Sequence, residues 1–198
     1  AYDTTAYRQN GDINATRMEA GLHGKMADGQ WTVRAYTYNS ERGIPGAIVN
    51  NVFRHGERLW DTNSFIQGTL TNRWSKRFRT LFNAKYAADY THYENQDAKL
   101  IQTKNTYKQK EVYFSCANLC NILEHWEVSL AYDFQWNTLD ATFYMPTESD
   151  GTFPYPTRYT HMAALATAFE WGRLKMQASL LGYFVHEKVE RFEARPDK

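Results

Sequence analysis

The chain has 198 residues, with 23 basic and 22 acidic side chains and a net charge of +1. This balance lacks the strong positive charge of nucleic-acid-binding proteins, so no nucleic acid is expected as a partner. Aromatic residues make up 16% of the chain, yet its mean hydropathy is −0.68. No run of about 18 apolar residues is present, which excludes a transmembrane helix.

Alternation of apolar and polar residues with period two predicts strands along most of the chain. The clearest stretch is Trp126–Trp136 (WEVSLAYDFQW), which has a large apolar residue at every even number and a small or polar residue at every odd number. The predicted strands, in chain order, are 14–26, 31–40, 58–72, 77–93, 106–122, 126–144, 158–170 and 173–188. We therefore predict an all-β, antiparallel fold.

The connections between these strands alternate in length. The short ones are 27–30, 72–76, 123–125 and 171–172, and the long ones are 41–57, 94–105 and 145–157. Tight turns at one end of the strands and long loops at the other are typical of outer-membrane barrels. The alternation therefore favours an up-and-down transmembrane β-barrel that includes all of residues 1–198.

Aromatic residues suggest two belts, as expected at the two interfaces of a bilayer. Four tryptophans lie in or beside short connections, namely Trp31, Trp74, Trp126 and Trp171. Tyrosines gather nearer the long loops, namely Tyr36, Tyr38, Tyr90, Tyr93, Tyr107 and Tyr144. We predict a belt at each end of the strands, with lipid covering the band between them.

Charged residues are nearly absent from the predicted apolar faces, where a Lys or Arg facing lipid at mid-depth costs about 2–4 kcal/mol. The opposite faces carry Arg77, Arg79, Lys85, Glu111, Glu127 and Asp133. We expect these to line a watery lumen or to contact a polar plug. A soluble antiparallel sheet with one solvated face is the alternative interpretation of the same pattern.

No residue pattern indicates catalysis, a metal site or a cofactor. The six histidines are scattered, and neither HExxH nor CxxC spacing occurs. Cys116 and Cys120 would lie on one strand face roughly 13 Å apart at ~3.3 Å per residue, too far for a disulfide. We interpret both cysteines as small apolar residues and expect the chain not to be an enzyme.

Two long loops contain the candidate ligand-binding residues. In the loop Glu41–Glu57 these are Arg42, Arg54 and His55, and in the loop 145–159 they are Tyr155 and Tyr159, whose rings suit stacking on a flat ligand. A purely architectural role is the alternative for both loops, because a Gly-Ile-Pro-Gly core forms a tight turn and prolines stiffen the second loop.

Two stretches carry a family resemblance: YNSERGIPGAIV at 38–49 and ERLWDTNSFIQGTL at 57–70. They resemble a segment of TonB-dependent outer-membrane receptors, in the form common in gut anaerobes. The matching residues are Ser40, Glu41, Arg42, Gly43, Ile44, Pro45 and Gly46, then Arg58, Leu59, Trp60, Asp61, Gln67 and Gly68.

The resemblance implies a 22-stranded barrel with a plug domain, which imports a scarce, bulky nutrient such as a corrinoid or an iron chelate. The energy for import would come from the TonB complex through the plug. Because the chain has room for about eight strands, we expect it to be part of a larger barrel. Its partners would then be outer-membrane lipid, the plug, the remaining barrel strands and, as a further candidate, a surface lipoprotein.

Two other interpretations remain open at this point. A complete eight-strand outer-membrane barrel with an adhesive or structural role requires the first strand to pair with the last. A soluble carbohydrate-binding β-sandwich would use exposed tyrosines and tryptophans for binding.

Overall fold

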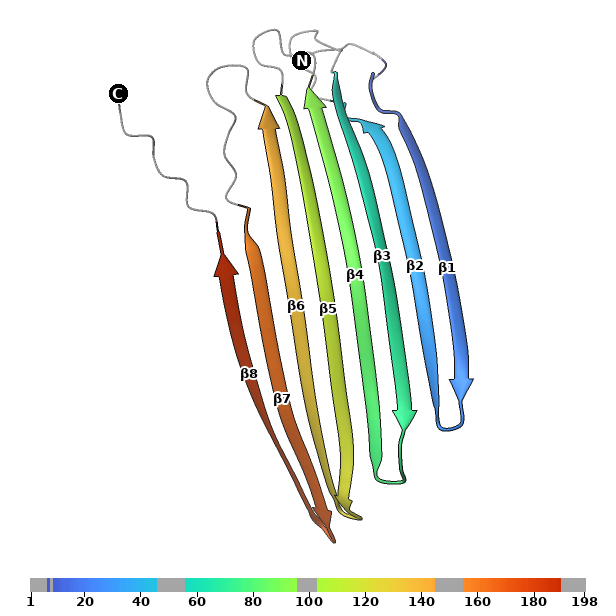
Figure 1. Cartoon of the computed structure of the whole chain (residues 1–198), viewed down its shortest axis with the longest axis vertical. Helices are drawn as coiled ribbons and strands as arrows, with labels where there is room; N and C mark the ends of the chain where they lie inside the picture. Colours follow the sequence, from blue (N-terminus) through green and yellow to red (C-terminus); the bar gives the residue numbers. More distant parts are fainter. Residues whose placement is uncertain (1–6, 8, 46–55, 96–102, 145–154, 190–198) are drawn as a thin grey trace, which may run out of the picture.

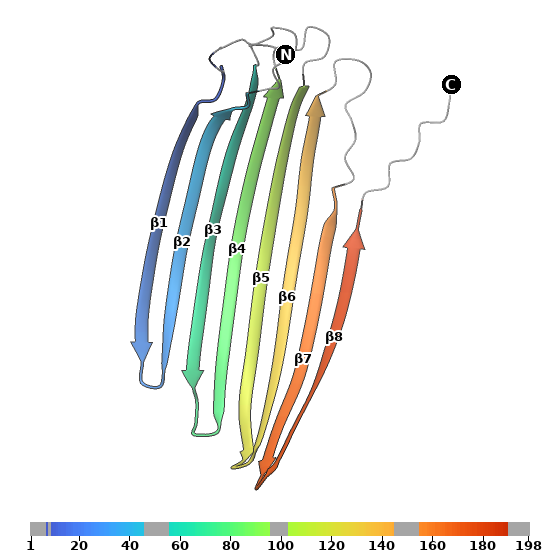
Figure 2. The ribbon, with the colours of Figure 1, turned by 180° about the vertical axis from the view of Figure 1, so that it is seen from behind.

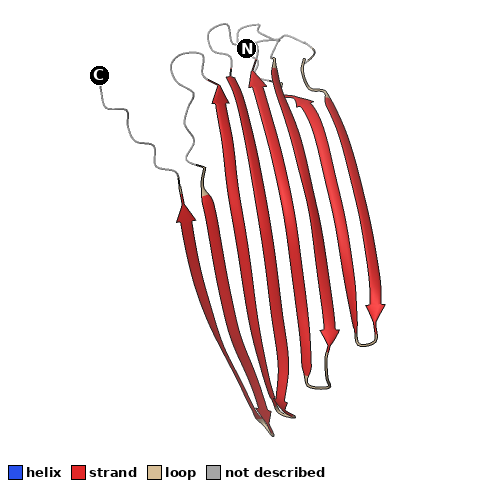
Figure 3. Ribbon diagram, in the orientation of Figure 1, coloured by secondary structure: helices blue, strands red, loops and turns tan. Residues whose placement is uncertain are grey.

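A computed structural model describes residue 7 and residues 9–45, 56–95, 103–144 and 155–189. They form eight strands and no helix (Figure 3). The strands are β1 (Ile13–Met26), β2 (Gly29–Gly43), β3 (Glu57–Arg73), β4 (Phe78–Asn95), β5 (Thr103–Leu123), β6 (Trp126–Tyr144), β7 (Thr157–Trp171) and β8 (Leu174–Lys188). All eight predicted strands are confirmed, and no strand end moves by more than three residues.

The strands form one antiparallel sheet in the order β1-β2-β3-β4-β5-β6-β7-β8, so each strand pairs with its neighbours in sequence (Figures 1 and 2). The four short turns lie together at the lower end in Figure 1, and β1 begins and β8 ends at the opposite end. The prediction of an up-and-down antiparallel meander is confirmed. We call these two ends of the sheet the short-turn end and the loop end.

The sheet is open. β1 and β8 are its two edges, and the described residues contain no pairing between them and no second sheet. This part of the chain therefore forms neither a closed eight-strand barrel nor a two-sheet sandwich.

The short turns leave only two to four residues between consecutive strands. Gly172, in the turn between β7 and β8, has a φ of 61°, in the left-handed region that favours glycine. Between β5 and β6 the register shifts from Asn121 to Leu123, which accommodates the turn through a bulge. These compact turns fix the register of each hairpin, and the register sets which side chains share a face.

A hydrophobic core is missing from the described part of the chain. Its only buried hydrophobic residues are Ala87 and Ala141, and no large side chain is fully buried. Large apolar side chains such as Leu180, 72% exposed, and Phe184, 62% exposed, stand out from one side of the sheet. Contiguous exposed apolar surface of this extent is typical of an interaction surface.

Candidate functional site

The register joins the apolar stripes of all eight strands into one continuous face. Side chains directly opposite one another on neighbouring strands point to the same side of a sheet. One such row across the sheet is Leu22, Val33, Gly68, Ala84, Phe114, Phe134, His161 and Phe184. The next row toward the loop end is Ala20, Ala35, Ile66, Tyr86, Val112, Trp136, Tyr159 and His186. We call this side the apolar face and the other side the polar face.

Charged residues appear on the apolar face only toward the loop end. On β6, for example, no Asp, Glu, Lys or Arg lies on this face between Trp126 and Asp140. Counted from the short turns, the first charged residues of the face are Glu41, Arg58, Glu94, Lys110, Asp140 and Lys188 on six strands, and β1 and β7 have none. About twelve uncharged positions at ~3.3 Å each, tilted by ~45°, give a band about 28 Å high.

Four tryptophans mark the short-turn end of this band, as predicted. They are Trp31, Trp74, Trp126 and Trp171. Two of the indoles donate hydrogen bonds from Nε1 to threonine Oγ1 atoms, Trp126 to Thr167 at 2.7 Å and Trp74 to Thr80 at 3.0 Å. Their rings are partly exposed, and their polar groups point to defined partners on the same sheet.

The predicted tyrosine belt is only partly correct. Tyr36, Tyr38, Tyr93 and Tyr107 alternate onto the polar face, whereas Tyr90 lies on the apolar face. The physical reason is that distance along a strand sets the height of a residue, and its odd or even position sets its face. On the apolar face, Trp60 and Tyr90 lie in neighbouring rows near the loop end, and Tyr86, Trp136 and Tyr159 share one row closer to the short turns.

The polar face carries charges that are joined in networks. Lys85 Nζ lies 3.0 Å from Glu111 Oε1, and Gln135 Nε2 donates to Glu111 Oε2 at 3.1 Å. Tyr113 donates to Asp133 at 3.3 Å. The residues predicted for this face, Arg79, Lys85, Glu111, Glu127 and Asp133, all lie on it, and Arg77 lies in the turn before β4.

The predicted ligand-binding residues do not form one cluster. Arg42, on β2, lies on the polar face and forms an ion pair with Asp61 at 3.3 Å. Tyr159, on β7, lies on the apolar face. Tyr155 precedes β7 with a φ of 37°. Arg54 and His55 lie outside the described residues, so ligand binding by this set stays a prediction.

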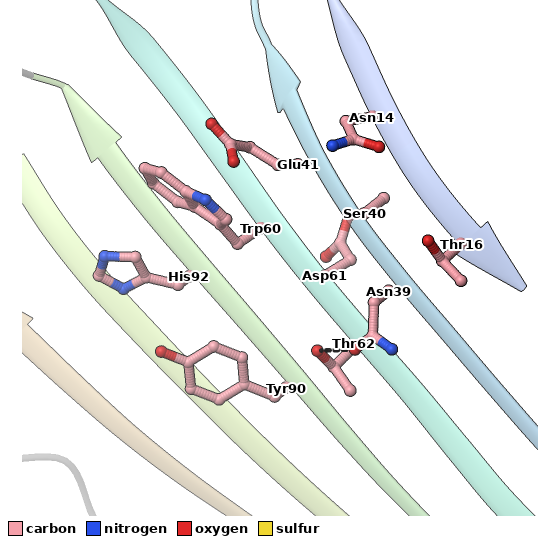
Figure 4. Close-up of a pocket in the computed structure, with 10 residues that line it drawn as sticks. All are labelled: Asn14, Thr16, Asn39, Ser40, Glu41, Trp60, Asp61, Thr62, Tyr90 and His92. Carbon is pink, nitrogen blue, oxygen red and sulfur yellow. Dashed lines mark hydrogen bonds between the residues drawn. The ribbon is translucent and has the colours of Figure 1, made fainter.

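A hollow of about 530 Å³ lies at the loop end over β1 to β4, and Figure 4 shows its lining. We call it the loop-end hollow. It is lined by Asn14, Thr16, Asn39, Ser40, Glu41, Trp60, Asp61, Thr62, Tyr90 and His92. Most of these side chains belong to the apolar face, at the loop-end limit of the uncharged band.

Three rings form one side of the loop-end hollow. The centroids of Trp60 and His92 are 5.3 Å apart, and the rings of Tyr90 and His92 stack at 6.4 Å with an interplanar angle of 18°. Both nitrogens of His92 are engaged, Nδ1 with Thr106 Oγ1 at 2.8 Å and Nε2 with Glu94 at 3.0 Å. These bonds fix the orientation of the imidazole.

The opposite side of the hollow is polar. Thr62 donates to Asn39 Oδ1 at 2.8 Å. Glu41 forms an ion pair with Arg58, which also contacts Asp12 at 2.9 Å. Hydrogen bonds from the Arg58 guanidinium hold the pKa of the Asp12 carboxyl below its usual range.

No single motif in the sequence predicts this hollow. Its rings lie on β3 and β4, more than 20 residues apart in sequence, and only the pairing of Trp60 with His92 brings them together. The sequence feature that could have indicated the hollow is the presence of aromatic residues at alternate positions near the loop ends of two neighbouring strands.

The described residues contain no group of three or more His, Cys, Asp or Glu side chains placed to hold a metal ion. Among the same residues, no helix has the length and apolar character needed to cross a membrane.

No protein-family model matches the chain, and no curated protein compared with it is similar to it. A function therefore has to follow from the two faces of the sheet and from the hollow at its loop end.

Proposed function

We propose that the chain forms part of the wall of an outer-membrane β-barrel, in a TonB-dependent receptor that imports a scarce, bulky nutrient. The apolar face would lie against lipid, and the polar face would line the lumen. The observation that carries the proposal is the uncharged apolar face, continuous across eight strands and uncovered by a second layer in the described residues.

The dimensions of the uncharged band support contact with lipid. Its height of about 28 Å is close to the ~25 Å apolar band of outer-membrane barrels. Leu165, near the middle of the band on β7, is 46% exposed, and its neighbours across the sheet are Leu130 and Leu180. Water would have to solvate this leucine patch, whereas hydrocarbon would cover it without cost.

The tryptophans at the short-turn end also support placement of the apolar face in a membrane. An indole with a hydrogen-bonding N–H and a large apolar ring favours the interface between hydrocarbon and water. In the proposed arrangement the short-turn end lies at the inner, periplasmic interface, and the long connections lie outside the cell.

The polar face suits a lumen that contains a plug. Charged side chains within a few positions of mid-strand, such as Lys85 and Glu111, are tolerated there because they are paired and in contact with water or with polar protein. The open edges of β1 and β8 fit the proposed larger barrel, because unpaired backbone groups in lipid cost several kcal/mol each. Further strands of the same barrel would form hydrogen bonds with the unpaired backbone groups of β1 and β8.

The receptor part of the proposal is supported by the motif at 38–49 and 57–70. Within the described residues, Glu41 binds Arg58 and Arg42 binds Asp61, so the two halves of the motif meet across β2 and β3. A corrinoid, an iron chelate or a similar nutrient would bind at the outer loops. Its import would draw on the TonB complex through the plug, with a surface lipoprotein as a further candidate partner.

The two cysteines provide a direct test of lipid contact. Cys116 lies on the apolar face of β5, and the adjacent Ser115 lies at the same depth on the polar face. A bimane label on Cys116 in a Cys120→Ala variant should be quenched by brominated lipid when the full-length protein is reconstituted in vesicles. The same label on Ser115→Cys, with Cys116 and Cys120 replaced by alanine, should be quenched far less.

Equal quenching at the two positions would refute the membrane placement. Failure of the folded protein to partition into vesicles or detergent micelles would refute it as well.

Nutrient import is tested separately. Cells that lack the protein should lose accumulation of a labelled corrinoid or iron chelate, and a protonophore should abolish accumulation in cells that have it. Accumulation that survives the protonophore would contradict TonB-dependent transport.

A further inference from the structure

We propose that the loop end of the apolar face binds the phosphorylated sugar headgroup of a glycolipid in the outer leaflet. The sugar would occupy the loop-end hollow, and a phosphate would contact Lys108 and Lys110. The inference rests on the membrane placement proposed above, because the site lies on the side of the sheet assigned to lipid.

The lining of the loop-end hollow suits a sugar ring. Trp60, Tyr90 and His92 provide flat apolar surface with polar edges, on which the C–H groups of a pyranose ring can lie. Asn14 and Asn39 add amide groups on the other side of the hollow. Carboxamides can both donate to and accept from sugar hydroxyls, which suits a ligand with many hydroxyl groups.

Two lysines border the hollow on the next strand. Lys108 lies directly opposite Tyr90 in the register, and Lys110 is two positions closer to the uncharged band. Their Cα atoms are therefore about 7 Å apart on one face. Both side chains are exposed.

The charges of these two lysines are not neutralised by ion pairs within the described part of the chain. Lys104, on the same face, contrasts with them, because its Nζ lies 2.8 Å from Glu94. Asp140 lies opposite Lys108 on β6, and no salt bridge joins them. Lys110 lies between Ala88 and Thr138. A phosphate group would supply the missing negative charge.

The position of the lysines favours an amphiphile over a soluble anion. From the hollow, β3 and β4 continue toward the short turns into Ile66, 51% exposed, and Tyr86, 44% exposed. An acyl chain attached to a sugar in the hollow would lie along this apolar surface. Lysines at the border of an apolar band are favourable beside anionic headgroups, whereas the same residues at mid-depth would be costly.

Native mass spectrometry of the detergent-solubilised full-length protein tests the proposal. The probes are lipid A, which is a bisphosphorylated glucosamine disaccharide with acyl chains, dephosphorylated lipid A, the deacylated headgroup, and phosphatidylglycerol. We expect lipid A to bind most tightly. The deacylated headgroup should bind weakly because it cannot contact the apolar band, and phosphatidylglycerol should bind weakly because it has no sugar ring.

The lysines are tested with the double variant Lys108→Ala, Lys110→Ala. We expect lipid A to bind about thirtyfold more weakly, since each lysine at an anionic surface contributes a factor of about five. Binding of dephosphorylated lipid A should not change. The matched control is Lys25→Ala, Lys76→Ala, which removes two exposed lysines at the short-turn end and should leave lipid A binding unchanged.

The hollow is tested with Trp60→Ala, which should weaken binding of both phosphorylated and dephosphorylated lipid A. Tyr90→Leu is a second variant that keeps most of the side-chain volume and removes the stacking surface. Circular dichroism confirms that each variant retains its sheet before binding is measured.

Wild-type affinity of the double lysine variant for lipid A would overturn the inference. Equally tight binding of the deacylated headgroup would identify a soluble-sugar site instead, and equally tight binding of phosphatidylglycerol would show unspecific anion attraction. These failures are distinguishable from failure of the proposed function, because the quenching contrast between Ser115 and Cys116 depends on neither the lysines nor the hollow.

Discussion

A lysine placed at the centre of the apolar face should destabilise the protein far more than a lysine placed beside it on the polar face. Leu165 and Ala164 are adjacent on β7, at the same depth and on opposite faces. Leu165 is 46% exposed in the sheet itself. If this face lay in water, Leu165→Lys would therefore remove only part of the free energy gained by burying a leucine side chain, about 1 kcal/mol.

Against lipid, the same substitution should cost about 2–4 kcal/mol, because the ammonium group would enter hydrocarbon near mid-depth. The ratio of folded to unfolded protein would fall by about 30- to 900-fold. Ala164→Lys should cost little in comparison, since its side chain would extend into the polar lumen.

The assay is equilibrium unfolding of both variants in phospholipid vesicles with guanidinium chloride, followed by tryptophan emission. Wild-type protein provides the reference, and equal m-values show that both variants unfold the same surface. A free-energy loss for Leu165→Lys no larger than that for Ala164→Lys would refute the assignment of this face to lipid.

Two further predictions concern local geometry. Gly172→Ala should destabilise the protein by about 1 kcal/mol, because residue 172 has a φ of 61°. Gly182→Ala should be tolerated, because the nearest atom to the new Cβ, a backbone oxygen, would lie 3.8 Å away. The unfolding midpoints of the two variants test this prediction, and equal midpoints would contradict it. The lowered pKa of Asp12 means that its pairing with Arg58 stabilises the loop end above the pKa of an unfolded Asp and is lost as pH falls through the lowered folded value. The protection factor of the Gly43 N–H, which donates to the Asp12 carbonyl, should fall over that acidic range in wild type, and this fall should be absent in Arg58→Ala.

Strand positions and the composition of their faces could be predicted from the sequence, because both follow from a local alternation with period two. Trp126–Trp136 illustrates this, since its even-numbered residues all lie on the apolar face of β6. The appearance of charge toward the loop end of the apolar face could also be predicted, because the same parity places Asp140 on that face after seven uncharged positions, Trp126 to Thr138. These features need no knowledge of neighbouring strands.

The loop-end hollow could not be predicted in this way, because it depends on register. Trp60 and His92 meet only because β3 and β4 are joined by a turn of fixed length, and a shift by one residue would move His92 to the opposite face. The tyrosines show the same limit. Their closeness to the long loops predicts one belt for Tyr38 and Tyr90, whereas the parity of their positions places them on opposite faces.

Alternation also explains the motif that carries the family resemblance. Glu41 and Arg42 are adjacent and therefore point to opposite faces, where Glu41 binds Arg58 and Arg42 binds Asp61. The motif thus ties β2 to β3 by one ion pair on each side of the sheet.

The N-terminal segment strengthens this tie at the start of the long connection. The Asn10 side chain donates to the backbone carbonyls of Ile44 at 3.2 Å and Glu57 at 2.7 Å, and the N–H of Ile44 donates to the Glu57 carbonyl at 3.0 Å. Ion pairs and backbone bonds together hold the two ends of the connection at a fixed separation. Arg42 is paired with Asp61 while 49% of its side chain stays exposed, so its part in ligand binding remains a prediction beside the hollow that adjoins the motif.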